Sequence, residues 1–230
     1  MNRPYVICHI MMSIDGKVTG DFLFREEAEN ATEIYYEINR RYKADAFVCG
    51  RVTMEGSFTQ KWYPDLTQYE PITEMTDYVP TTLSKFYAVA FDPKGKLGWK
   101  TNRIVDDDPG YGNAQIIEVL TKSVDPHYLA YLQDKNIAYI FAGESQIDVK
   151  LALSKLKTMF GIETLLLEGG SVINGTFQQA DVIDELSLVV APTIADKNSK
   201  PLFDNAVISD FSLNKIQLFD NDVLWLNYKK

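Results

Sequence analysis

Cysteine and histidine are scarce in this chain of 230 residues, which has two of each. Cys8 and Cys49 both lie in apolar runs, where buried free thiols are commoner than a disulfide, so we expect a protein of the reducing cytoplasm. Together with His9 and His127 they are too few and too scattered for a zinc cluster. We therefore expect no metal site.

Long apolar runs and clusters of basic residues are also absent. No segment approaches the roughly 20 apolar residues of a membrane span, and the apolar stretch 5–14 lacks the cleavage site of a signal peptide. The 23 Lys and Arg are outnumbered by 32 Asp and Glu, which gives a formal net charge of −9. Because binding of nucleic-acid phosphates needs clustered cations, we do not expect nucleic acid as a partner. Without an apolar span we do not expect a membrane as a partner either.

The chain does have ample apolar material, with 46% hydrophobic and 12% aromatic residues. Apolar runs predict strands that alternate with amphipathic helices, and residues 59–85 are expected to be irregular. The predicted strands are 5–12, 46–49, 86–91, 115–120, 137–142, 163–167, 184–191, 213–219 and 223–229, and the main helices are 25–43, 126–133, 147–160 and 171–180. This order predicts one α/β domain over residues 1–230, with a mainly parallel sheet and a C-terminal antiparallel hairpin.

Glycines stand at two predicted junctions between a strand and a helix. Gly50 precedes Arg51 and Thr53, and Gly169-Gly170 lies between Glu168 and Ser171. Glycine lets backbone N–H groups approach a phosphate, and ligands of open α/β sheets bind at the carboxyl ends of strands. The two elements are candidates for clamps on one dinucleotide. The alternative for Gly50-Arg51 is an ordinary turn with a surface charge. The alternative for Gly169-Gly170 is a glycine loop that binds no ligand.

Two acidic residues, Asp15 and Glu168, follow predicted strands beside these glycine elements. Either is a candidate to donate a proton to a small-molecule substrate bound there. The alternative for Asp15 is a turn residue that accepts local N–H bonds, and for Glu168 a carboxylate favoured by a helix terminus. We expect His9 to be a core residue and His127 a surface residue.

Several segments in order resemble one family. They are Ser13–Lys17 after the first strand, Gly50–Thr53 after the second, Leu165–Gly170 with Asn174 behind it, and Ala180–Leu186 followed by Ala191-Pro192. This set is similar to the reductase domain of bacterial riboflavin biosynthesis, the RibD C-terminal domain, in the dihydrofolate-reductase-like superfamily. The resemblance covers nearly the whole chain.

The resemblance implies a homodimer that binds NADPH and reduces the ribosyl side chain of a phosphoribosylamino-pyrimidine to ribityl. It places Asp15 near the nicotinamide and Glu168 on the substrate side, and Arg51 at the cofactor phosphates, where a fixed guanidinium favours NADPH over NADH. The implied cofactor-binding residues are Met12, Gly50, Arg51, Thr53, Gly169, Gly170, Ser171, Val172, Ile173 and Asn174.

The substrate stays open at this point. The segments Gly20–Phe24 and Glu55–Thr59 stand where the family's substrate-binding elements are expected, and they differ from the family pattern. A reductase of another small carbonyl or imine is one alternative, and a non-enzymatic NADP-binding or sensing protein is another. Trp62 and Tyr63 are expected either to form a lid over a flat ring or to dock on a partner.

Overall fold

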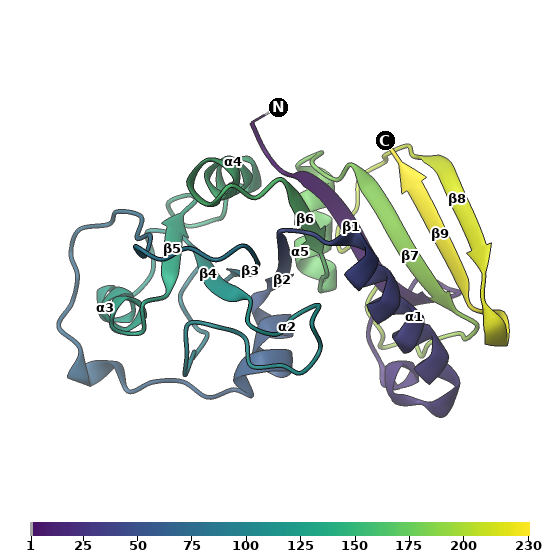
Figure 1. The fold of residues 1–230 in the computed structure, drawn as a ribbon, viewed down its shortest axis with the longest axis horizontal. Coiled ribbons are helices and arrows are strands. Elements are labelled where there is room, and N and C mark those ends of the chain that lie inside the picture. Colours follow the sequence, from purple (N-terminus) through teal and green to yellow (C-terminus); the bar gives the residue numbers. More distant parts are fainter. Residues whose placement is uncertain (1) are drawn as a thin grey trace. The chain divides into compact units, whose positions relative to one another are not determined.

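The computed structural model describes residues 2–230 and divides the chain into two compact units (Figure 1). The first unit consists of Asp45–Glu163 with the N-terminal residues up to Pro4, and the second of Tyr5–Ala44 and Thr164–Lys230. That both units form one domain stays a prediction. No helix among residues 2–230 has the length and apolar character needed to cross a membrane.

The first unit is built on four parallel strands in the order β5-β4-β3-β2. The strands are β2 (Ala46–Gly50), β3 (Tyr87–Phe91), β4 (Gln115–Leu120) and β5 (Ala138–Phe141), and the helices are α2 (Arg51–Met54), α3 (Pro126–Asp134) and α4 (Val149–Phe160). Every residue of β3, β4 and β5 is buried, which explains why these strands are continuous apolar runs in the sequence. Asp148 caps the start of α4, and Gly161 ends it in the left-handed conformation.

Helix α2 continues into a π-helical segment, Glu55–Thr59. From there to β3 the only helical element is the short 3₁₀ turn Leu66–Gln68, so the predicted irregular region is confirmed. Its aromatic residue Tyr63 packs against the first unit, although Trp62 and Tyr63 both stay more than one-third exposed. The Tyr63 hydroxyl donates to the Gly95 carbonyl at 2.8 Å, and its ring stacks on that of Tyr128. The backbone at Trp62 lies so close to Gly98 that a Cβ on this glycine would meet the Trp62 oxygen at 2.0 Å.

The second unit has a mixed sheet in the order β6-β1-β7-β9-β8. Its strands are β1 (Tyr5–Ser13), β6 (Thr164–Leu167), β7 (Glu185–Ala191), β8 (Ser212–Leu218) and β9 (Leu224–Lys229), and its helices are α1 (Glu26–Tyr42) and α5 (Ser171–Gln179). β6, β1 and β7 are parallel, whereas β9 is antiparallel to both β7 and β8. The predicted fold class and the C-terminal hairpin are therefore confirmed.

Helix α1 covers one face of this sheet. Its buried residues Ala31, Ile34 and Ile38 form an apolar cluster with Val189 of β7. A polar group sits beside this cluster: His9 Nδ1 is 2.9 Å from the Ser187 hydroxyl, and its Nε2 is 3.0 Å from the Tyr35 carbonyl oxygen. Burial lowers the pKa of His9 to about 4, which keeps the ring neutral. The expected core role of His9 is confirmed.

Candidate functional site

The glycine turn between β6 and α5 is formed as the sequence predicts. Gly169 has a φ of +94°, a conformation that favours glycine, and the peptide bond to Gly170 is cis. A Cβ on Gly169 would lie 3.7 Å from the Asn174 amide nitrogen, so the Asn174 side chain faces this turn. The turn brings backbone and a buried polar side chain to the start of α5.

The first turn of α5 offers hydrogen-bonding groups to a ligand. The N–H groups of Ser171, Val172 and Ile173 precede the first intrahelical bond, which Asn174 donates to the Gly170 carbonyl at 3.1 Å. The Ser171 hydroxyl and the Asn174 side-chain oxygen are buried and have no hydrogen-bond partner. The Asn174 amide nitrogen donates to the Leu202 carbonyl at 3.1 Å, and this bond fixes the direction in which the Asn174 side-chain oxygen points.

These atoms suit a phosphate-bearing cofactor. The N-terminal end of a nine-residue helix carries partial positive charge, and free N–H groups with a hydroxyl are the donors that bind a phosphate. The Asn174 oxygen is an acceptor for a hydroxyl or amide of the same ligand. Leaving a buried polar atom unpaired costs about 1–3 kcal/mol, which a ligand that pairs it would recover.

Glu168 lies between β6 and this turn and is held from α1. The Asn39 side-chain nitrogen donates to Glu168 Oε1 at 2.5 Å, across 129 positions of sequence. Asn39 is only 5% exposed, whereas Glu168 is half-buried and reaches solvent. The bond fixes a carboxylate at the carboxyl end of β6, beside the glycine turn. Asn39 was not among the residues predicted from sequence.

Met12 and Asp15 lie at the carboxyl end of β1, in the same unit as α5. Met12 is half-buried. Asp15 Oδ1 accepts hydrogen bonds from the Ser13 hydroxyl at 2.7 Å and from the Ala195 backbone nitrogen at 3.0 Å. These bonds lower the pKa of Asp15, so it stays a carboxylate near neutral pH. This geometry matches the turn alternative, because it ties the loop after β1 to the loop after β7.

Gly50, Arg51 and Thr53 lie in the first unit, at the end of β2 and in α2. Gly50 is extended, with φ −74° and ψ 159°, and Arg51 begins the helix. The Arg51 guanidinium donates to Glu55 Oε2 at 3.1 Å and remains 37% exposed, so it is accessible to an anion. The two glycine elements thus lie in different units, and a joint grip on one molecule stays a prediction.

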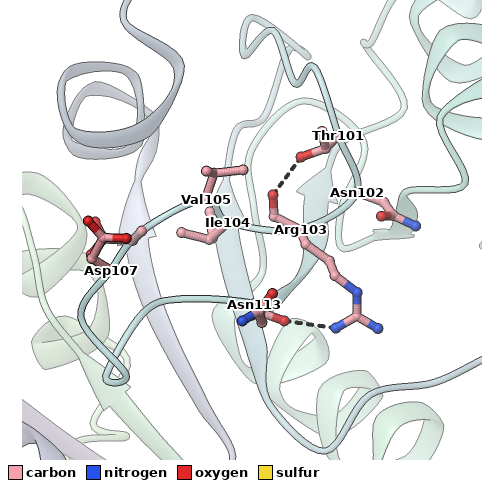
Figure 2. A pocket seen from close by; sticks show the side chains of 8 residues that line it. Thr101, Asn102, Arg103, Ile104, Val105, Asp107 and Asn113 are labelled. Atoms are coloured by element: carbon pink, nitrogen blue, oxygen red, sulfur yellow. Dashed lines mark hydrogen bonds between the residues drawn. The ribbon is translucent and has the colours of Figure 1, made fainter.

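A hollow of about 650 Å³ lies elsewhere in the first unit, on the loop that leads into β4 (Figure 2). Its lining residues are Thr101, Asn102, Arg103, Ile104, Val105, Asp106, Asp107 and Asn113. The Arg103 guanidinium donates to the Asn113 carbonyl at 2.8 Å, and the Thr101 hydroxyl donates to the Arg103 carbonyl at 2.7 Å. These hydrogen bonds join residues of one loop, so the cavity is formed within that loop. None of the predicted site residues lines it.

The two cysteines and His127 lie where the sequence analysis expects them. Cys8 and Cys49 are buried and are not joined in a disulfide, as expected. His127 is on the surface, where its Nδ1 lies 2.8 Å from Asp125 Oδ1. Across residues 2–230, His, Cys, Asp and Glu side chains form no group of three or more that is arranged to hold a metal ion.

A mainly parallel α/β sheet with a glycine turn at the start of a helix is typical of enzymes that bind a nucleotide cofactor. The chain belongs to the RibD C-terminal domain family, whose pattern matches residues 4–225. This confirms the resemblance seen in the sequence and the class of enzyme, an oxidoreductase.

Relatives support the assignment to this family. A 2,5-diamino-6-ribosylamino-4(3H)-pyrimidinone 5′-phosphate reductase of Methanothermobacter thermautotrophicus is 26% identical over 91% of this chain and 88% of its own length. The enzyme of the same name from Kluyveromyces lactis is 28% identical over 83% of this chain and 73% of its own. Acinetobacter baumannii RibD has the same fold, with a TM-score of 0.65 at 18% identity, and this chain covers 58% of its length.

Proposed function

We propose that this protein is an NADPH-dependent reductase that acts in the cytoplasm on a phosphoribosylamino-pyrimidine and reduces its ribosyl side chain to ribityl. The proposal rests on family membership and on relatives named for reduction of a ribosylamino-pyrimidinone 5′-phosphate. Hydride transfer to a carbonyl or imine carbon needs a donor cofactor and a proton source at the heteroatom.

One observation supports the cofactor site above all others. The Ser171 hydroxyl and the Asn174 side-chain oxygen are buried without a partner beside the N-terminal N–H groups of α5. In our proposal Gly169, Gly170, Ser171, Val172 and Ile173 hold the cofactor through their backbone, with the Asn174 oxygen as an acceptor. Bound NADPH supplies the hydride.

In this proposal the first unit supplies a cation for the cofactor phosphates. Gly50 lets the backbone come close to the cofactor, and Thr53 offers a hydroxyl. The accessible Arg51 guanidinium binds the phosphate that distinguishes NADPH from NADH. Glu55 holds Arg51 in place until the phosphate competes for it.

Glu168 and Asp15 have separate roles in this proposal. Glu168, oriented by Asn39, delivers the proton to the heteroatom directly or through a water that it holds. Asp15 has a lowered pKa and is therefore a poor acid, so it acts by fixing the loop beside Met12 at the nicotinamide end.

The experiment is a fluorescence titration with NADPH and NADH, followed by turnover with pyrimidine, pteridine and simple carbonyl substrates. We expect NADPH to bind more tightly than NADH and to be oxidised with a ribosylamino-pyrimidine phosphate. Ser171→Ala removes the unpartnered hydroxyl and is expected to weaken NADPH about tenfold, on the scale of one hydrogen bond to a charged group. Thr176→Ala is the matched control, because this exposed hydroxyl of α5 bonds only to the Val172 carbonyl.

Two results would contradict the proposal in different ways. Failure to bind NADPH would remove the cofactor site. Stoichiometric binding without oxidation by any substrate of the panel would favour a protein that senses NADPH without turnover.

A further inference from the structure

A long connection without helix or strand, residues 192–211, joins β7 to β8 in the second unit. Connections of this kind that exceed about 12–15 residues are uncommon in compact proteins and usually serve a function. Residues 192–209 of the connection are hydrogen-bonded both to the loop after β1 and to α5, and we call them the β7–β8 strap. The strap therefore contacts both parts of the second unit that carry predicted site residues.

The first half of the strap is paired with the loop after β1. The Val18 nitrogen donates to the Lys200 carbonyl at 2.9 Å, and the Leu202 nitrogen donates to the Gly16 carbonyl at 3.0 Å. The backbone of an irregular segment needs such partners because it has no helix or sheet to supply them. These bonds, with the one that Asp15 accepts, hold the strap at the carboxyl end of β1.

The second half of the strap lies along α5. The Asp204 nitrogen donates to the Ser171 carbonyl at 3.0 Å, and the Leu202 carbonyl accepts from the Asn174 amide. A Cβ on Gly175 would collide with the Asp204 carbonyl oxygen, so the strap backbone lies directly against the helix. The position of the strap therefore determines where the Asn174 side chain points.

Gln178, one turn of α5 beyond Asn174, binds the strap through its whole side-chain amide. Its Nε2 donates to the Val207 carbonyl at 2.6 Å, and its Oε1 accepts from the Val207 nitrogen at 2.9 Å. The same Nε2 donates to the Ser209 hydroxyl. Gln178 is only 6% exposed, and burial of an amide is costly unless the amide is hydrogen-bonded. Two bonds to the same residue fix both the distance and the direction of the strap at this point.

We propose that Gln178 is a positioning residue for the cofactor, which acts through the β7–β8 strap on Asn174. The inference rests on the proposed function, since it assigns Gln178 a part in NADPH binding. The Asn174 oxygen is buried without a partner, and the Asn174 nitrogen is bonded to the strap at Leu202. While Gln178 holds the strap, this oxygen is oriented before the ligand arrives, so binding does not have to immobilise it.

The test is a fluorescence titration of the full chain and its variants with NADPH. Gln178→Met keeps the length of the side chain and removes its amide, and it is expected to weaken NADPH about fivefold, the scale of immobilising one side chain. Asn174→Ala removes the oriented oxygen itself, so in this background Gln178→Met is expected to have little further effect. Gln133→Met is the matched control, because that glutamine bonds to the Tyr139 hydroxyl in the first unit.

A second variant breaks the same contact from the side of the strap. Val207→Pro removes the N–H that Gln178 accepts and leaves α5 unchanged, at a residue that is 54% exposed. We expect it to fold and to weaken NADPH by about twofold or more, since it removes one of the two bonds to Val207. Thermal unfolding by circular dichroism reports whether each variant is folded.

Hydrogen exchange of the ligand-free chain measures separately whether Gln178 holds the strap. In Gln178→Met we expect faster exchange at the amides of Leu202, Asp204 and Val207. Unchanged exchange there, or wild-type NADPH affinity in the folded variants at 178 and 207, would overturn the positioning role. So would an equal loss of affinity in the wild-type and Asn174→Ala backgrounds, which is the result of a purely structural role. A wild type that binds no NADPH would contradict the proposed function, and the positioning role with it.

Discussion

Asn39 and Glu168 are joined by a hydrogen bond of 2.5 Å between α1 and the end of β6. The donor is buried and the acceptor is half-buried at the start of the glycine turn. A bond from a buried amide to a carboxylate restricts the carboxylate to one orientation. In the proposed reductase this orientation decides whether Glu168 reaches the reacting heteroatom.

Replacing Glu168 by Gln is expected to lower kcat by about 10²–10⁴-fold, the range of a lost general acid. NADPH affinity is expected to be unchanged, because Gln keeps the oxygen that accepts from Asn39. Steady-state kinetics and a cofactor titration measure the two effects separately. Glu163→Gln, at an exposed glutamate paired with Lys157, is the control. A normal kcat in Glu168→Gln would remove the carboxylate from the mechanism.

Replacing Asn39 by Leu is expected to lower kcat about tenfold or more, because the Glu168 carboxylate loses its fixed orientation. The decisive measurement is a double-mutant cycle. If Asn39 acts through Glu168, Asn39→Leu has little further effect on kcat in the Glu168→Gln background. Equal losses in both backgrounds would reduce Asn39 to a purely structural residue.

Much of the fold was predictable from sequence because the strands are buried apolar runs. The strand 115–120 has the predicted bounds, and α1 was placed within a residue at each end. The glycine turn before α5 was also predictable, because Gly169 has a positive φ that few other residues adopt. These features depend on neighbours within a few positions of the chain.

The features that the sequence did not reveal depend on distant partners. The contact of Asn39 with Glu168 spans 129 positions, and the one sequence signal was an asparagine four residues after Tyr35 in the apolar stripe of α1. The exposure of Ile216 depends on β8 being the edge of the sheet. A predicted strand with alternating polarity gives no information about its place in the order.

Replacing Gly170 by Val is expected to abolish NADPH binding and leave the fold intact. The φ of Gly170 is −78°, which valine adopts without strain, whereas its side chain would obstruct the approach of a phosphate to the N–H groups of α5. Cofactor titration and a thermal unfolding curve check both parts. Gly56→Val is the control, since a Cβ there meets nothing within 4 Å. Unchanged affinity in Gly170→Val would place the cofactor elsewhere.

Replacing Arg51 by Ala is expected to weaken NADPH more than NADH, by the roughly 1.5–3 kcal/mol of a charged hydrogen bond, or about 10–100-fold. The difference arises because only NADPH carries the additional phosphate. Arg103→Ala, at the hollow before β4, is the control for loss of an arginine in the same unit. Equal losses for the two cofactors would contradict the role given to Arg51.

The stability of the first unit is expected to fall as pH rises, because of Glu118 in β4. Glu118 is fully buried, its Oε1 accepts from Trp99 and Tyr128, and its Oε2 has no partner. Burial, and then the nearby Asp92 carboxylate, raise the pKa of Glu118 well above its usual value, so the folded chain keeps this carboxyl protonated. Asp92 is also buried, and one of its oxygens has no hydrogen-bond partner. Burial raises the pKa of Asp92 as well.

The direction of the pH effect follows from which state binds the proton more tightly. Below a pH of about 4.5 the folded and unfolded chains are both protonated at Glu118, and no free energy of unfolding is lost. Above it the unfolded chain releases the proton while the folded chain retains it, so the free energy of unfolding declines until the folded pKa is passed. Glu118→Gln mimics the neutral acid, and urea unfolding between pH 5 and 9 is expected to show a flatter profile and higher stability at pH 9. Glu144→Gln, at a glutamate whose side chain is 80% exposed, should retain the wild-type slope. If Glu118→Gln also retains it, the proton lost on unfolding belongs to another group.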